Sequence, residues 1–253
     1  MAEAACPKCG GSGWVIVERE GVSGAERCGC AAPLRARTLM ESAGIPPLYA
    51  EASLDNFLLP EDNPLAYRGL SKAMVDVLTY ANQFPDLPKP GLLLMGEAGA
   101  GKTHLAVAAL RMLIARGFAG VFFDYQNLLD RIRAGYDPTA GASDREVYRS
   151  ALEAEVLLLD DLGAHRVLEW IEDTVTSIVT YRCNHRKALI ATTNLPDPAA
   201  GDTIVQRVPG ASQVDYRISL SDRIGERARS RLFEMCTVVR IWGVGDYRTR
   251  KMR

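Results

Sequence analysis

A glycine loop at residues 96–103 constrains this chain more than any other feature of its sequence. It reads G-E-A-G-A-G-K-T, follows the apolar run 92–95 and precedes the apolar run 105–110. In a strand–loop–helix setting of this kind, backbone N–H groups and the helix N-terminus surround phosphate oxygens. The alternative interpretation is a Gly-rich turn that binds no ligand, but it does not account for the Lys-Thr pair at the end of the motif. The loop therefore predicts a site for a nucleoside triphosphate and Mg²⁺.

The side chains at the end of the loop carry distinct expected roles. Lys102 supplies a mobile cation for the β- and γ-phosphates, and Thr103 supplies a hydroxyl for Mg²⁺. The predicted nucleotide contacts in and beside the loop are Gly96, Glu97, Ala98, Gly99, Ala100, Gly101, Lys102, Thr103 and His104.

The chain from the loop onwards alternates apolar strand candidates with helical patterns, which is typical of an α/β parallel sheet. A near-continuous apolar run such as residues 156–159 suits a strand that is buried on both faces. The predicted strands are residues 92–95, 120–124, 155–159, 188–193 and 237–242, and the predicted helices between them are residues 103–116, 126–134, 144–154 and 169–182. We therefore expect a five-stranded parallel sheet between helices.

Polar side chains follow two of these strands. Asp160 and Asp161 end the run 156–159, where one carboxylate can hold Mg²⁺ and the next can orient the attacking water. The second position is more often Glu, and Asp is one methylene shorter, so we expect slow hydrolysis. Asn194 ends the next strand and either starts a turn or hydrogen-bonds the lytic water. Its order after the two acids favours the second interpretation.

Paired cysteines near the N-terminus predict a small zinc module. Cys6 and Cys9 form a C-x-x-C turn, and Cys28 and Cys30 form a later C-x-C pair. Four such thiolates suit a closed tetrahedral zinc site, and about thirty residues cannot hold a fold by apolar burial alone. Reactive free thiols and a disordered tail are the alternatives. Residues 14–18 look like the first strand of a hairpin that turns at residues 21–24.

The expected domains are the zinc module at 1–32, a helical connector at 33–53 and the ATPase domain at 54–253. A short helix at residues 31–42 opens the connector, and a helix with the apolar positions 70, 73, 74, 77 and 78 precedes the loop 84–90. Residues 196–214 read as a surface loop. Cys183 and Cys236 lie in apolar or helical contexts, where core packing is the simplest interpretation.

Charge and composition limit the partners and the location. The net charge of −1 gives no global field that attracts nucleic acid, but residues 217–253 hold ten Arg or Lys against four Asp or Glu. No apolar run approaches the roughly 20 residues that span a bilayer, and the N-terminus lacks the basic and apolar regions of a signal peptide. We expect a cytoplasmic protein without a membrane partner.

A run of arginines follows in a probable helix. Arg227 and Arg231 share a helix face at i and i+4, while Arg229 points elsewhere. A solvated face is the default interpretation. The functional one is an arginine finger that reaches the γ-phosphate of a neighbouring subunit.

These motifs, in this order, resemble the bacterial DnaC/DnaI helicase loaders and the IstB-type transposition ATPases, a branch of the AAA+ superfamily. Residues 45–57 are similar to the segment that borders the adenine pocket in that group. Residues 91–103 resemble its Walker A region, 157–163 its Walker B, 192–194 its sensor I and 225–232 its box VII. The resemblance implies that Arg231 is the arginine finger and that Arg248 is sensor II, and the cysteine module looks like that of DnaI-type loaders. The longer stretch between Pro196 and Ser221 departs from the pattern.

The resemblance further implies an ATP-dependent loader that places the replicative hexameric DNA helicase on single-stranded DNA. Its N-terminal module would contact the helicase, and its ATPase domains would self-associate, with ATP as the assembly switch. DNA contacts are expected from the basic C-terminal residues and from Arg131 or Arg133. The alternatives are an IstB-like transposition helper, a small-molecule P-loop kinase and a zinc-bearing binding module that holds nucleotide without hydrolysing it.

Overall fold

The computed structural model describes residues 6–9, 12, 14–19, 22–29, 31–135, 142–164, 168–202 and 218–246. Its centre is a five-stranded sheet in the order β4-β5-β6-β3-β7, and every neighbouring pair is parallel. The strands are β3 (Gly91–Gly96), β4 (Gly120–Asp124), β5 (Val156–Asp160), β6 (Ala188–Thr193) and β7 (Cys236–Ile241). The predicted α/β class and five-stranded parallel sheet are therefore confirmed.

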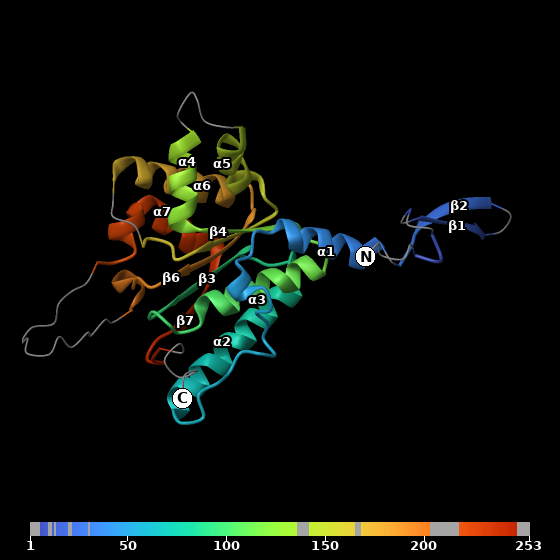
Figure 1. Cartoon of the computed structure of the whole chain (residues 1–253). Helices are drawn as coiled ribbons and strands as arrows, with labels where there is room; N and C mark the ends of the chain where they lie inside the picture. Colours follow the sequence, from blue (N-terminus) through green and yellow to red (C-terminus); the bar gives the residue numbers. More distant parts are fainter. Residues whose placement is uncertain are drawn as a thin grey trace, which may run out of the picture.

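Helices cover both faces of the sheet, as Figure 1 shows. One layer holds α1 (Ala31–Ser42), α2 (Pro64–Gln83) and α3 (Lys102–Ala115), and the other holds α4 (Tyr125–Gly135), α5 (Ala142–Glu153), α6 (Glu169–Asn184) and α7 (Ser221–Met235). Side chains alternate along each strand, so Leu92 and Leu94 join the core under α2 and α3 while Leu93 and Met95 join the other core. Short 3₁₀ turns lie at η1 (Pro47–Tyr49) and η2 (Pro198–Ala200).

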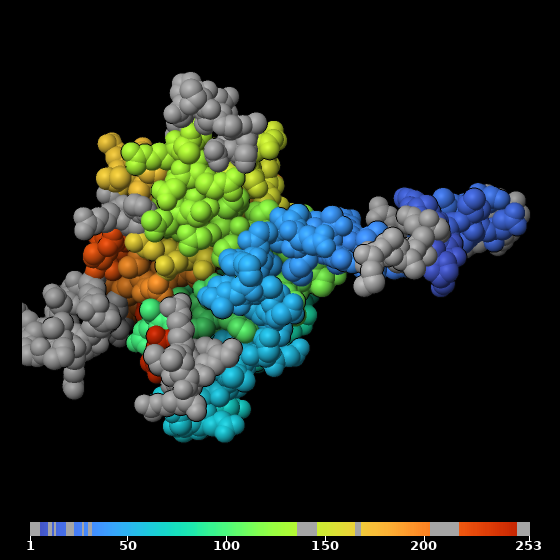
Figure 2. Space-filling model, viewed as in Figure 1, coloured from blue at the N-terminus to red at the C-terminus, as the bar shows by residue number. Residues whose placement is uncertain are grey.

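The N-terminal hairpin lies apart from the α/β body, beyond α1, in both Figure 1 and Figure 2. Its strands are β1 (Trp14–Arg19) and β2 (Val22–Arg27), paired antiparallel with Glu18 opposite Ser23. The predicted turn at residues 21–24 is therefore wrong in its extent. Val22, Ser23 and Gly24 belong to the second strand because the register brings them opposite residues of β1.

Arg182 ties the layer of α4–α7 to the sheet. Its guanidinium is fully buried and donates to the carbonyl oxygens of Ala151 (2.9 Å), Leu152 (3.1 Å), Ala154 (3.0 Å) and Ala188. Two of these carbonyls belong to the last turn of α5, where a helix leaves acceptors without partners. Burial lowers the pKa of Arg182 to about 10, so the side chain stays charged near neutral pH.

The remaining elements follow the sequence pattern with local differences. Helix α7 begins at Ser221 and is interrupted at Gly225, whose φ of 80° is not helical. In α2, Leu78 belongs to the predicted apolar stripe but is 41% exposed. Cys236 is buried as expected and Cys183 is half-buried. The predicted loop 196–214 contains η2, and its residues 203–214 lie outside the described part. No helix within the described ranges is both long and apolar enough to cross a bilayer.

Candidate nucleotide-binding site

Two glycines give the loop between β3 and α3 its shape. Gly99 and Gly101 have φ values of 76° and 88°, in the left-handed region that side chains disfavour. A Cβ on Gly101 would lie 2.6 Å from the Phe57 ring, and one on Gly99 would lie 2.1 Å from an Asp246 carboxylate oxygen. Both positions therefore require glycine for the backbone conformation and for the close approach of a neighbour.

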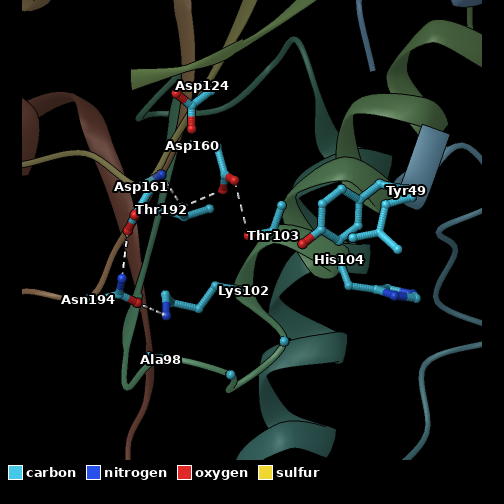
Figure 3. A pocket seen from close by; sticks show the side chains of 13 residues that line it. Tyr49, Ala98, Lys102, Thr103, His104, Asp124, Asp160, Asp161, Thr192 and Asn194 are labelled. Carbon is cyan, nitrogen blue, oxygen red and sulfur yellow. Dashed lines mark hydrogen bonds between the residues drawn. The ribbon is translucent and has the colours of Figure 1, made fainter. Parts of the chain in front are cut away.

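A cavity of about 700 Å³ opens over this loop at the carboxyl ends of β4, β5 and β6 (Figure 3). Parallel sheets bind ligands at this edge. The predicted contacts that line it are Ala98, Gly99, Gly101, Lys102, Thr103, His104, Asp160, Asp161 and Asn194. Gly96 and Ala100 are instead buried. Thus the structure brings together predicted residues from three separate segments of the chain: the glycine loop, the end of β5 and the end of β6.

Lys102 connects the glycine loop to the end of β6. Its Nζ donates to the Glu97 carbonyl oxygen at 2.7 Å and to Asn194 Oδ1 at 2.5 Å. The Asn194 amide nitrogen in turn donates to Asp161 Oδ1 at 2.6 Å. Asn194 therefore joins the loop lysine to the second acid, and a phosphate that binds Lys102 would compete with the asparagine for its ammonium group.

Asp160 lies between two threonine hydroxyls. Thr103 Oγ1 donates to one carboxylate oxygen at 3.2 Å, and Thr192 Oγ1 donates to the other at 2.7 Å. The Thr192 hydroxyl also accepts from the backbone N–H of Asp161 at 2.9 Å, where the chain turns with a φ of 57°. Sequence reasoning did not assign Thr192 a role of its own, although its place just before Asn194 at the same strand end was a usable signal.

The carboxylates at one end of the cavity favour the binding of a cation. Burial is the largest cause that raises the pKa of Asp160, and the neighbouring carboxylates of Asp161 and Asp124 raise it further. The hydrogen bonds from Thr192 and Thr103 oppose this shift. Asp124, at the end of β4, was also missed in the sequence, although it ends a predicted strand. A hydroxyl and clustered carboxylates are ligands that Mg²⁺ prefers, so the residues present fit that ion.

The opposite side of the cavity is formed by η1. Leu48 and Tyr49 line it, as the resemblance of residues 45–57 to an adenine-side segment implies. His104 is held away from the acids because one ring nitrogen lies 2.8 Å from the Ser53 carbonyl oxygen and its ring meets Phe57 edge-on. An apolar and aromatic wall of this kind suits a nucleobase.

The predicted arginines lie elsewhere. Arg231, on α7, pairs with Glu234 at 2.7 Å and is not among the described residues that line the nucleotide cavity. Arg227 is exposed, while Arg229 turns inward to Asp197, as the helical spacing predicts. A second cavity between α6 and α7 is lined by all three arginines. Arg248 lies outside the described residues, so its predicted role as sensor II stays a prediction.

The N-terminal cysteines gather as the spacing predicts. The Sγ atoms of Cys6, Cys9 and Cys28 all lie within 4.8 Å of one another, and those of Cys6 and Cys28 are 3.8 Å apart. Tetrahedral zinc with Zn–S bonds of about 2.3 Å separates its sulfurs by about 3.8 Å. Three thiols therefore fit the ion. Cys30, the predicted fourth ligand, lies outside the described residues.

The sheet order and the cavity define this protein as a P-loop nucleotide-binding protein of the α/β class. The chain belongs to the family of IstB-like ATP binding proteins, which it matches over residues 73–204, within the AAA+ ATPases that include the DnaC helicase loaders. It is similar to the solved structure of a DnaC helicase loader, with 30% identity and a TM-score of 0.61 over 78% of this chain and 99% of that one.

Two further similarities cover most of the chain. The solved structure of DnaI shares 20% identity and a TM-score of 0.58 over 83% of this chain and 98% of that one, which shows a common fold. The phage-like element PBSX protein XkdC of Bacillus subtilis (strain 168) is 22% identical over 92% of this chain and 79% of its own length.

Proposed function

We propose that this protein is an ATP-dependent loader of a replicative hexameric DNA helicase onto single-stranded DNA. The observation that carries the proposal is the convergence of Lys102, Thr103, Asp160, Asp161 and Asn194 around one cavity, in a chain of the IstB-like family that aligns with nearly all of a DnaC helicase loader.

The residues that line the cavity have separate roles in ATP hydrolysis. Lys102 holds the phosphates by charge, while Thr103 and Asp160 would hold Mg²⁺, which neutralises negative charge on the phosphates. Asp161 accepts a proton from, or orients, the attacking water, and Asn194 holds Asp161 at 2.6 Å. The shorter Asp side chain in place of Glu favours slow turnover, which suits a switch better than a motor.

The partner contacts fall on separate parts of the chain. The cysteine cluster next to the hairpin forms a zinc module that docks on the helicase, and the exposed arginines of α7 contact a neighbouring copy. Arg133 is exposed beside the Trp170 ring, with its guanidinium 5.8 Å from the ring centroid. A cation next to an aromatic face is suited to single-stranded nucleic acid.

An IstB-like transposition helper is the second candidate, favoured by the family match over residues 73–204. The cysteine cluster argues for the loader because the domain appended to IstB-type proteins is typically helical and zinc-free. A small-molecule kinase would need an acceptor pocket and a lid. The described cavity is instead lined by Asn194 and by the acids at the end of β5.

Phosphate release, measured with and without single-stranded DNA and the host's replicative helicase, tests the proposal. We expect slow basal turnover that DNA or the helicase stimulates, together with co-elution of the helicase. Phosphorylation of a metabolite independent of DNA would contradict the loader, and nucleotide binding without any turnover would favour a non-hydrolytic binding module. Stimulation by a transposase in place of the helicase would favour the IstB-type function.

A further inference from the structure

The segment that follows Asn194 is tied to helix α7 by a largely buried ion pair. Asp197 Oδ2 accepts from Arg229 Nε at 2.7 Å, and the two side chains are 3% and 20% exposed. The Arg229 guanidinium also lies over the Phe233 ring, 4.7 Å from its centroid. A charge-assisted hydrogen bond in a desolvated place fixes the geometry of its partners more strongly than a surface pair does.

Three more contacts hold the same segment, residues 194–202, hereafter the sensor segment. The Pro196 carbonyl accepts from the N–H of Leu220, directly before α7, at 2.8 Å. The carboxylate of Asp202 accepts from the N–H of Asp197 at 3.1 Å and from Arg240 Nε, on β7, at 2.7 Å. The sensor segment is therefore anchored at its far end to β7 and along its length to α7.

The near end of the sensor segment meets the nucleotide site. Asn194 accepts from Lys102 and donates to Asp161, so both of its side-chain groups are engaged with residues of that site. A phosphate bound at Lys102 would compete with the asparagine oxygen for the ammonium group. Such a change in hydrogen bonding at Asn194 can reach other parts of the protein only through the contacts that the sensor segment makes.

Helix α7 also carries two exposed arginines, Arg227 and Arg231. They lie two residues on either side of Arg229, and together with it they line the cavity between α6 and α7. A small shift of α7 at Arg229 therefore moves both exposed side chains together.

We propose that the Asp197–Arg229 ion pair is the link through which nucleotide contact at Asn194 sets the position of α7 and of its exposed arginines towards a second copy of this chain. Asp197 and Arg229 are positioning residues, since neither lines the nucleotide cavity. The inference rests on the proposed function, because it requires a nucleotide at Lys102.

Hydrogen exchange with and without a slowly hydrolysed ATP analogue and Mg²⁺ tests the link without requiring turnover. Two peptides are followed at one protein concentration, one from the glycine loop (residues 97–104) and one from α7 (residues 226–235). In the parent protein we expect the nucleotide to slow exchange in both, by about fivefold or more in α7. In Arg229→Gln the loop should keep this protection and α7 should lose it.

Arg240→Gln is the matched control, because it breaks an ion pair of the same length to the same segment but on β7. It should retain both protections, and Arg229→Lys, which keeps the charge, should restore part of the α7 response. Asp197→Asn removes the same pair from its other side and replaces Arg229→Gln if that variant does not fold.

The results distinguish a failure of the proposed link from a failure of nucleotide binding. Protection of α7 that persists in Arg229→Gln, or that never appears in the parent while the loop is protected, overturns the proposed link and leaves nucleotide binding intact. If the glycine loop of the parent gains no protection, the nucleotide site itself is wrong, and the link is refuted with it.

Discussion

Replacing Gly101 by alanine is the sharpest perturbation of the phosphate-binding loop. The residue has a φ of 88°, and its new Cβ would lie 2.6 Å and 2.9 Å from two carbons of the Phe57 ring. A left-handed alanine costs about 1–2 kcal/mol, and forcing a methyl group against a packed ring costs about 1–3 kcal/mol more. The total of about 2–5 kcal/mol must appear either as lost stability or as a displaced loop.

The two outcomes are separated by measuring unfolding in denaturant and affinity for a fluorescent ATP analogue on the same variant. If the loop moves to relieve the strain, affinity falls by about 30-fold or more, since every 1.4 kcal/mol is about tenfold. If it does not move, the free energy of unfolding falls by the same amount. The geometry predicts the sum of the two losses, in binding free energy and in the free energy of unfolding.

Gly117→Ala provides a matched control. Gly117 has a φ of 93°, but a Cβ there meets no heavy atom within 4 Å. This variant should lose about 1–2 kcal/mol of stability and keep its nucleotide affinity. Adding Phe57→Leu to Gly101→Ala should recover the steric share, a coupling of about 1–3 kcal/mol in a double-mutant cycle. Gly101→Ala that behaves like Gly117→Ala would refute the contact with Phe57 as the constraint.

Three other substitutions test separate parts of the protein. Lys102→Ala should abolish nucleotide binding in a titration and leave the unfolding midpoint nearly unchanged; retained tight binding would contradict the role of the ammonium group. Cys28→Ser should lose zinc by metal analysis while binding ATP, and equal metal content in variant and parent would refute the thiolate site. Because the pKa of Asp160 is raised by burial, its proton is held more tightly in the folded state, so the group's stabilising contribution is present at low pH and lost as pH rises through that pKa. Asp160→Asn should therefore raise the unfolding midpoint of the ligand-free protein at neutral pH, and in the parent Mg²⁺-dependent nucleotide affinity should fall as pH drops through the same pKa. A lower midpoint, or an affinity insensitive to acid, would argue against this electrostatic description.

Much of the fold followed from local pattern. The strands at residues 120–124 and 188–193 have the predicted bounds. The first ends at the polar Asp124, and the second lies between the polar residues Lys187 and Asn194. The glycine loop and the two acids at the end of β5 were also recognisable, since phosphate and metal binding require these residue types at this spacing.

Contacts between distant segments were not predictable in the same way. Arg182 reads as a polar position near the end of a helix, yet it is fully buried and is satisfied by carbonyl oxygens that only the tertiary fold assembles. Likewise, Asp197 reads as part of a Pro-rich loop, and its pairing with Arg229 depends on how that loop crosses α7. The hairpin turn was predicted too far along the chain because Gly21 and Gly24 are typical turn residues, and they outweighed the strand preference of Val22 between them. The boundaries of the three proposed domains, and the roles of Arg231 and Cys30, stay predictions.

A crystal structure with Mg²⁺ and a non-hydrolysable ATP analogue tests the central claim most directly. It should show the γ-phosphate in contact with Lys102 Nζ, the metal ion beside Thr103 and Asp160, and Asn194 released from the lysine. An analogue bound elsewhere, or a metal ion distant from Asp160, would contradict the account.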